Sequence, residues 1–600
     1  MNRVINSATL VLLSGLPLYL FLNCVASLHA GQINFVYPSE GASLPSVSKT
    51  FIFGNISPST AVLTVNGEII SVHSNGGFIA YLPITTGDFS FNGTLEDGTT
   101  AQRALKVRQP ADAGPSTGTL KLEFTSHAAD SEVSGGEYLK ITAAGAPSRA
   151  AVCSLEGVFK DLPMAEVPRG SGRYYASYRV KDSDLGSGGG LVARFKAGLF
   201  AHGASARSKG KIKILKQPVL VETSTDAVVL KNAAEGGYMM FLPRGVKLIS
   251  GGRANGLRRI TLSNDELGWV DESRVQPVSG AQFPFSYGSE TGAIRLKKTD
   301  FGSSAAVTLY ERLPYTAEVM PWGLRLTLYY ANQHTNTVVY DSADTLVKNV
   351  SFRQAAYNKV EIDFETEPGA LWGYNISYPN SSRALQVDLR SRPRAELTWP
   401  KPLAGITVAL DPGHSPRFTP PYDGAIGPMA TLEFQVNMAI SLKLNEKLSA
   451  LGAAVKMTRA GDEIVALADR PKIAGDMGGD LFLSIHNNAI GDGEDPFTQP
   501  RGFSIYHSQR HSRALAAAIH RAYLKNIQLP DEGLRYGDYL VTRMTWMPAV
   551  LIENAYMIIP RQEEMLNTPA FQEELAGAIV EGVLEFFNVP ARTASAKKAQ

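Results

Sequence analysis

Two kinds of hydrophobic pattern divide the chain near residue 400. Before this point, apolar and polar residues alternate over short runs bounded by turn residues, as in "AVLTVNGEIISV". This period of two is typical of β-strands with one buried face. After it, apolar runs such as "GITVAL" and "PAVLIEN" alternate with segments whose apolar residues recur every three or four positions. The pattern predicts an all-β N-terminal region followed by a C-terminal α/β domain.

Three helices are predicted in the C-terminal third. In "LEFQVNMAISLKLNEKLSALG", the residues Val436, Ile440, Leu444 and Leu448 fall on one stripe, and Gly452 is placed to end the helix. The other two helices are "SRALAAAIHRAYLKN" and "FQEELAGAIVEGVLEFF". Strands that alternate with helices predict a mainly parallel sheet covered by helices on both faces. In such sheets, functional residues collect at the carboxyl ends of the strands.

Turn-rich and proline-rich stretches such as "ADAGPSTG" divide the β region into modules. One of these modules ends in "LGWVDESRV", which resembles the last strands of a bacterial Src-homology-3-like barrel. The predicted units are a signal peptide (1–30), an immunoglobulin-like β domain (31–110), a second β-sandwich domain (111–217), a Src-homology-3-like β barrel (218–277), a β-rich accessory domain (278–398), the α/β domain (399–590) and a disordered tail (591–600).

Composition agrees with an exported protein of several domains. A chain of 600 residues is too long for one core, and a net charge of +2 without a long basic run argues against nucleic acid as the main partner. The N-terminus has one early positive charge, Arg3, and then an apolar run from Ala8 to Val25, followed by small residues. This pattern predicts a secretory signal peptide, and an uncleaved membrane anchor is the alternative. The expected location is the cell envelope, periplasm or cell wall, with membrane contact only through this segment.

Four polar residues stand at the ends of predicted elements in the α/β domain. His414 follows the strand "GITVAL", His486 follows "DLFLSI", Glu553 ends "PAVLI", and Glu433 opens the next helix. We expect them to converge, because the carboxyl ends of parallel strands share one edge. Two His and one Glu suffice for catalytic zinc, and a second Glu can act as general base. Taken singly, each residue also has a simpler explanation. Each histidine can be a solvated or capping residue at a strand end, Glu433 can favour the helix N-terminus through the helix dipole, and Glu553 can be a surface residue.

Several segments of this domain resemble, in order and spacing, the motifs of the zinc-dependent N-acetylmuramoyl-L-alanine amidases. They are "ALDPGHSP", "YDGAIGPMATLEFQVNMA", "VKMTRAGDEIVALADR", "DLFLSIHNNA" and "PAVLIENAYM", within about residues 402–588. The resemblance implies that His414, Glu433 and His486 bind zinc and that Glu553 is the catalytic residue. It also implies the reaction, which is hydrolysis of the amide between the lactyl group of N-acetylmuramic acid and L-alanine in peptidoglycan.

The chain departs from the family in one loop and offers weaker candidates elsewhere. The insert "RFTPPYD" lengthens the loop after His414, which leaves the shape of the cleft wall and the stem-peptide preference open. Asn488 and Arg470 are candidates for substrate binding, although loop capping and helix–sheet ion pairing explain them equally well. The remaining histidines of the domain are interpreted as surface residues: His507, His511 and His520.

Two other functions stay open at this point. A zinc carboxypeptidase acting on stem peptides is disfavoured, because such enzymes usually carry two ligands close together, as in H-E-x-x-H. A catalytically inactive cell-wall-binding protein is disfavoured because all four candidate residues are present. In either case the N-terminal β modules are expected to bind the cell wall or a protein partner.

Overall fold

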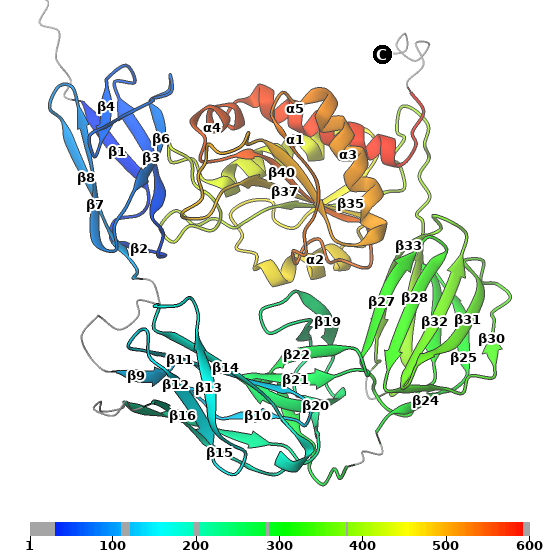
Figure 1. The fold of residues 1–600 in the computed structure, drawn as a ribbon. Coiled ribbons are helices and arrows are strands. Elements are labelled where there is room, and N and C mark those ends of the chain that lie inside the picture. The colour runs from blue at the N-terminus through cyan, green and yellow to red at the C-terminus, as the bar shows by residue number, and fades with distance from the viewer. Residues whose placement is uncertain (1–30, 110–120, 197–203, 284–286, 380–381, 592–600) are drawn as a thin grey trace, which may run out of the picture.

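A computed structural model of the chain describes most of its length. The described ranges are 31–109, 121–196, 204–283, 287–379 and 382–591. The predicted signal peptide, the linker "ADAGPSTG" and all but the first residue of the predicted tail lie outside them. Figure 1 shows β-rich modules arranged around one domain of mixed strands and helices. The chain is therefore multidomain, with a strongly β-rich N-terminal region.

The first module is built from two sheets, whose inner faces share a core that includes Phe35, Phe78 and Phe91. One sheet has the order β1-β3-β6 and the other β2-β8-β7-β4-β5. The strands are β1 Gln32–Tyr37, β2 Ala42–Leu44, β3 Lys49–Ser57, β4 Leu63–Val65, β5 Glu68–Ile70, β6 Gly77–Pro83, β7 Gly87–Leu95 and β8 Thr100–Val107.

The next two predicted modules share one continuous set of paired strands, because β10 pairs with β20 across the predicted boundary at residue 217. Residues 122–214 nevertheless have a core of their own around Ile141 and Tyr174. The strands are β9 Leu122–Phe124, β10 Ser131–Val133, β11 Tyr138–Gly145, β12 Ala151–Leu155, β13 Phe159–Glu166, β14 Arg173–Arg179, β15 Gly188–Phe195, β16 Ser205–Ile214, β17 Val219–Thr223, β18 Val228–Lys231, β19 Tyr238–Leu242, β20 Lys247–Ala254, β21 Leu257–Thr261, β22 Leu267–Asp271 and β23 Val275–Pro277.

The fourth β region contains two larger sheets, of order β30-β25-β26-β34-β33 and β27-β28-β32-β31, and the pair β24-β29. Its hydrophobic core is continuous with that of β17–β23, so the predicted boundary at residue 277 does not divide the core. The strands are β24 Ser289–Thr291, β25 Ile294–Thr299, β26 Gly302–Val307, β27 Tyr315–Met320, β28 Gly323–Tyr329, β29 Ala331–Gln333, β30 Val338–Val339, β31 Val347–Ala356, β32 Lys359–Thr366, β33 Leu371–Ser377 and β34 Leu385–Ser391.

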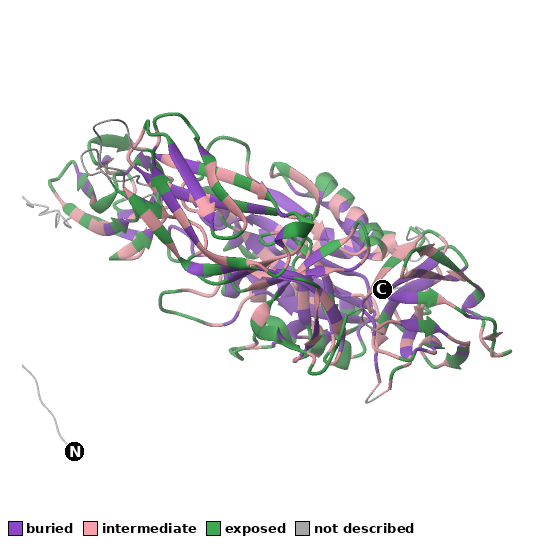
Figure 2. Ribbon diagram, turned by 60° about the horizontal axis from the view of Figure 1, so that its bottom comes forward, coloured by how far each residue is buried: buried purple, intermediate pink, exposed green. Residues whose placement is uncertain are grey.

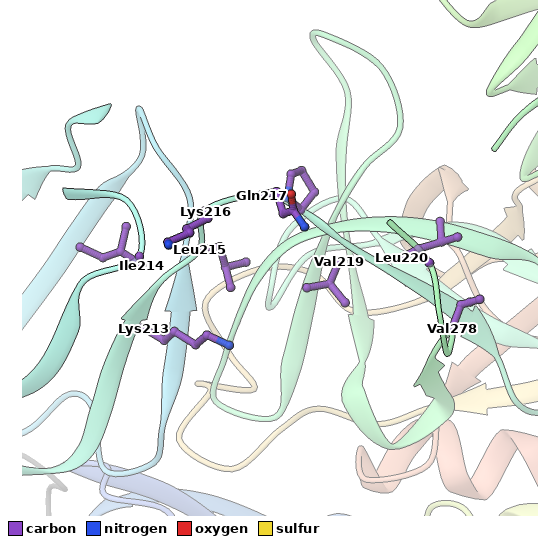
Figure 3. A pocket seen from close by; sticks show the side chains of 11 residues that line it. Lys213, Ile214, Leu215, Lys216, Gln217, Val219, Leu220 and Val278 are labelled. Atoms are coloured by element: carbon purple, nitrogen blue, oxygen red, sulfur yellow. The ribbon is translucent and has the colours of Figure 1, made fainter. Parts of the chain in front are cut away.

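A pocket of about 400 Å³ lies where the second β module joins the third. Figure 3 shows the residues that line it, which are Gly186, residues 213–220, Val278 and Ala281. None of the lining residues belongs to the C-terminal domain, in which the predicted site lies. This pocket is therefore separate from the predicted site.

The C-terminal domain is built on a six-stranded sheet of order β36-β35-β37-β40-β38-β39. The first four of these strands are parallel, whereas β38 runs antiparallel to β40, and β39 is parallel to β38. The prediction of a mainly parallel sheet is confirmed, and the two strands at one edge, β38 and β39, run in the opposite direction to the others. The central strands are almost wholly buried, and Figure 2 shows buried residues gathered inside the molecule. The strands are β35 Thr407–Pro412, β36 Ala454–Met457, β37 Leu481–Asn488, β38 Phe503–His507, β39 Asp531–Tyr536 and β40 Ala549–Tyr556.

Helices cover the two faces of this sheet unequally. In Figure 1, α1, α3 and α5 lie on one side and the short α2 lies on the other. The helices are α1 Glu433–Ala450, α2 Arg470–Asp476, α3 Arg513–Asn526, α4 Pro560–Leu566 and α5 Pro569–Phe586. The three predicted helices are confirmed, and α2 and α4 were not expected. Within the described ranges, no helix combines the length and apolar character needed to cross a membrane.

Candidate active site

The register of the central strands brings the four predicted residues to one edge of the sheet. His486 on β37 pairs directly with Glu553 on the neighbouring β40. On the other side of β37, β35 ends at Pro412, and His414 follows in the next turn. Glu433 is the first residue of α1, as predicted. His486 and Glu553 lie inside their strands rather than at the ends, but the expected convergence occurs.

His414, Glu433 and His486 form a compact cluster. Nε2 of His414 lies 3.1 Å from Oε2 of Glu433, and Nδ1 of His486 lies 3.2 Å from Oε1 of the same carboxylate. The three potential ligand atoms lie within 4.8 Å of one another. The Glu433 side chain is only 3% exposed, so its charge needs partners. Two imidazole nitrogens around a buried carboxylate are a donor set that fits a zinc ion.

A short loop directs His414 into this cluster. His414 has a φ of 62°, in the left-handed region, which turns the chain sharply after β35. Its Nδ1 forms a hydrogen bond of 2.9 Å with Asp423, and the second oxygen of Asp423 accepts a bond from the backbone N–H of Ser415. With Nδ1 held by a carboxylate, Nε2 is left to face the metal position. Asp423 was not predicted, because a carboxylate nine residues beyond a candidate histidine ligand does not by itself show that the loop folds back.

Two glycines allow the cluster to close. A Cβ atom on Gly413 would lie 2.3 Å from the ring of His486. A Cβ atom on Gly424 would lie 2.7 Å from the ring of His414 and 2.8 Å from Oε2 of Glu433. Gly424 also has a φ of 95°, which side chains other than hydrogen disfavour. Gly413 of "DPG" and Gly424 of "DG" therefore leave the space in which the side chains of His414, Glu433 and His486 meet.

The charges of the cluster favour a bound cation. Burial opposes a charge on His414, but the neighbouring Glu433 and Asp423 raise its pKa to about 9. Burial would also raise the pKa of Glu433, but His414 and His486 hold it well below its usual range. A buried, negatively charged carboxylate that is stabilised by positive neighbours is suited to a metal ion at the same place.

Glu553 stands beside the cluster in a different environment. Burial raises its pKa well above the usual range, and repulsion by Glu433 adds to this effect. Its Oε2 is buried and has no hydrogen-bond partner among the residues that the structure describes. The environment thus favours the charged form of Glu433, whose pKa is lowered, and the protonated form of Glu553, whose pKa is raised. Such a pair is typical of sites with acid–base chemistry.

The two weaker candidates are placed differently. Arg470 is 3% exposed, and its guanidinium donates to Asp411 at 2.7 Å and to the carbonyl of His414 at 2.8 Å. Its buried guanidinium therefore holds the loop that carries His414, and binding of substrate by Arg470 stays a prediction. Asn488 lies at the end of β37, two residues beyond His486. Its Nδ2 is buried without a partner among the described residues, and its contact with substrate stays a prediction.

The three other histidines are not surface residues, so that prediction was wrong. His507 is 9% exposed, and His520 is half-buried where it bonds Asp531. His511 is largely enclosed between its own domain and the fourth β region, with its ring 6.4 Å from that of Tyr374. His511 lies in the short turn Arg510–Ser512, which contacts β27 of the fourth β region, and the local sequence pattern does not reveal this contact.

Comparison with known proteins decides the family of this domain. The family described as N-acetylmuramoyl-L-alanine amidase matches residues 408–585, the stretch that contains all four residues of the site. The C-terminal domain belongs to the N-acetylmuramoyl-L-alanine amidase family. The amidase domain makes up about a third of the chain, and the match does not extend to the β modules.

Relatives of the chain carry names from the same family. The probable cell wall amidase LytH of Staphylococcus epidermidis is 34% identical over 189 residues, which are 31% of this chain and 60% of the relative. The N-acetylmuramoyl-L-alanine amidase LytC of Bacillus subtilis is 31% identical over 186 residues, 31% of this chain and 36% of the relative. Among solved structures, the amidase AmiC2 of Nostoc punctiforme is 29% identical with a TM-score of 0.28, covering 30% of this chain and 97% of that one. The chain thus spans about 60% of the length of LytH.

Proposed function

We propose that the protein is a zinc-dependent N-acetylmuramoyl-L-alanine amidase that cleaves the bond between the lactyl group of N-acetylmuramic acid and L-alanine in peptidoglycan. The observation that carries this proposal is the cluster of His414, Glu433 and His486 with Glu553 beside it, whose buried Oε2 has no hydrogen-bond partner among the described residues. The family of the domain and the relatives named as cell wall amidases support peptidoglycan as the substrate.

Hydrolysis of an amide needs an activated water and stabilisation of the charge that develops on the carbonyl oxygen. His414, Glu433 and His486 would hold a zinc ion, which would supply both by lowering the pKa of its water from about 15.7 to about 7 and by polarising the carbonyl. Glu553 takes a proton from the attacking water and later delivers it to the amine of L-alanine. Its raised pKa suits the second step, because the carboxyl must hold the proton until the amine leaves.

The N-terminal modules fit a role in placing this domain at the wall. We infer that residues 31–110 form an immunoglobulin-like domain, 111–217 a second sandwich, 218–277 a Src-homology-3-like barrel and 278–398 an accessory domain, and that these modules bind cell wall or a protein partner. Residues 1–30 are proposed to direct export to the periplasm or cell wall. The two-sheet architecture of the first module supports the first of these assignments.

The reaction is tested by product analysis with the full-length protein. Purified muropeptides incubated with enzyme and Zn²⁺ are expected to release stem peptides that begin with L-alanine, and chelation should stop the release. Free D-alanine among the products would instead show a carboxypeptidase. Metal binding without any product would show an inactive wall-binding protein.

The role of Glu553 is tested by Glu553→Gln. General acid–base catalysis contributes about 10²- to 10⁴-fold, so turnover should fall by that factor while zinc stays bound. Glu574→Gln, on the exposed side of α5, is the matched control and should keep full activity. A variant that loses its metal together with its activity would mean that Glu553 is a ligand rather than the proton carrier.

A further inference from the structure

One sheet of the first β module buries both of its faces. On β3, Ile52 points into the core of the module itself. The opposite face carries Tyr37, Phe51 and Phe53, whose rings stack at centroid distances of 5.5 Å from Tyr37 to Phe51 and 5.3 Å from Tyr37 to Phe53. Phe51 and Phe53 are 2% and 1% exposed although they lie outside that core. They are covered by the amidase domain, which stands beside this module in Figure 1.

The residues that cover this face flank the metal-binding positions. Leu432 and Phe434, on either side of Glu433, belong to the same hydrophobic cluster as Phe51 and Phe53. Tyr422, which packs against that cluster, directly precedes Asp423, the partner of His414. The first module therefore contacts the chain one peptide away from a metal ligand and from the residue that orients another ligand.

Partly buried hydrogen bonds tie the same surfaces together. Nδ2 of Asn55 donates to the carbonyl of Pro428 at 2.7 Å, in the loop that leads to α1. The hydroxyl of Tyr37 donates to Asp492 at 2.6 Å, in the segment that follows the strand of His486. Burial and the contact with Asp492 raise the pKa of Tyr37 far above its usual value, so its hydroxyl remains a donor. The loop between His414 and Glu433 and the segment that follows β37 are thus both bonded to the first module.

Helix α4 holds the loop before α1 from another side. The backbone N–H groups of Met429 and Thr431 donate to the buried carboxyl of Glu563 at 2.9 and 3.2 Å. Next to it, Glu564 bonds His73 of the first module at 2.8 Å. The loop is therefore held between α4 and the first module, and α4 itself is linked to that module. Removing the module would take away one of the supports of this loop.

We propose that the first β module is a structural part of the active site, in which Tyr37, Phe53 and Asn55 act as positioning residues for the metal-binding loops. In this role the module does more than target the enzyme to the wall: its docking fixes the geometry of His414 and Glu433. The inference deepens the proposed amidase function and rests on it for the identity of the metal. The positioning itself is tested without substrate.

The test uses the full-length protein with Phe53→Asp, which places a charge in the apolar contact and separates the two domains. Partners that orient metal ligands are worth about 10- to 100-fold in metal affinity. We therefore expect Phe53→Asp to lose Zn²⁺ to EDTA at least about 10-fold faster than the parent protein. The absorption spectrum of the Co²⁺-loaded variant should also change, since it reports ligand geometry. A parental rate of metal loss and an unchanged spectrum would overturn the proposal.

Two further variants make the result decisive. The control is Gln102→Ala, because Gln102 is exposed on β8 in the other sheet of the same module, and this variant should leave the rate of metal loss unchanged.

The second test variant, for the case that Phe53→Asp does not fold, is Asn55→Ala. It removes only the bond to Pro428 and should still accelerate metal loss, whereas a parental rate contradicts the proposal. With muropeptides, kcat should fall while KM changes little. A parent that binds metal but cleaves no muropeptide would refute the amidase function and leave the EDTA experiment valid.

Discussion

At the residue scale, the candidate site separates the groups proposed to bind metal from the groups that orient them. His414, Glu433 and His486 were predictable because each stands where an apolar strand ends or a helix begins. Asp423 was not, because its contact with His414 depends on how the inserted "RFTPPYD" loop folds back. The hydrogen bond between His414 and Asp423 spans an irregular loop, and such a contact produces no periodic pattern in the sequence.

Asp423→Ala should weaken metal binding. The substitution frees Nδ1 of His414, so the ring loses its fixed tautomer and orientation, and affinity for Zn²⁺ should fall about 10- to 100-fold. Competition with a chelator of known affinity measures the change. Asp462→Ala, an exposed carboxylate in the same domain, is the control. Equal affinities for the two variants would contradict the orienting role of Asp423.

Arg470→Ala distinguishes support of the loop from binding of substrate. Its guanidinium forms a buried pair with Asp411, and removing one partner of such a pair costs about 3–5 kcal/mol. The melting temperature should therefore drop strongly. Lys472→Ala breaks only an exposed pair on the same helix and should change the stability by less than about 0.5 kcal/mol. A stable Arg470→Ala variant with a raised KM would instead support the predicted role in substrate binding.

At the element scale, long periodic segments were predictable and short ones were not. The central strands and α1, α3 and α5 follow from continuous apolar runs and a helical period. The seven-residue α2 has Pro471 at its start, and β39 is interrupted by Gly533, so neither gives a clear pattern. The reversed direction of β38 was also hidden, because strand direction depends on the chain path rather than on composition.

Gly413→Ala should disrupt the junction between β35 and β37. The added methyl group would stand 2.3 Å from the ring of His486, so the ring or the loop must move. We expect loss of bound Zn²⁺, measured by metal analysis after dialysis, together with loss of activity. Gly461→Ala is the control, because the nearest atom to its new methyl group is 3.6 Å away. A metal-loaded Gly413→Ala variant would show that the loop has room to shift.

At the scale of the whole molecule, β modules and amidase domain are interlocked. Trp372 of β33 is 4% exposed within the core of the amidase domain and donates to the carbonyl of Asp480 at 2.7 Å. Arg390 of β34 pairs with the Asp480 side chain at 2.5 Å. The division into modules followed from linkers and changes of pattern, but these contacts join residues far apart in the chain. The sequence therefore predicted independent modules, whereas in the structure the modules pack against the amidase domain.

This docking should make stability depend on pH through His511. Burial lowers the pKa of His511 to about 4, against a weaker opposite effect of its contact with the Met547 carbonyl. The unfolded chain, with a histidine pKa of about 6.5, binds more protons than the folded one between about pH 6.5 and 4. Stability should therefore fall as the pH drops through this window, by on the order of 3 kcal/mol in total.

Thermal unfolding of the full-length protein between pH 7 and pH 4.5 measures this dependence. His511→Gln removes the buried imidazole, so its melting temperature should decline less steeply with acidification than that of the parent protein. His334→Gln, a solvent-exposed histidine of the fourth β region, should keep the parental slope. The comparison isolates one group, because many carboxylates titrate equally in all three proteins. If all three slopes coincide, the His511 ring accepts a proton in the folded state, and the junction between the two domains must open far enough to hydrate it.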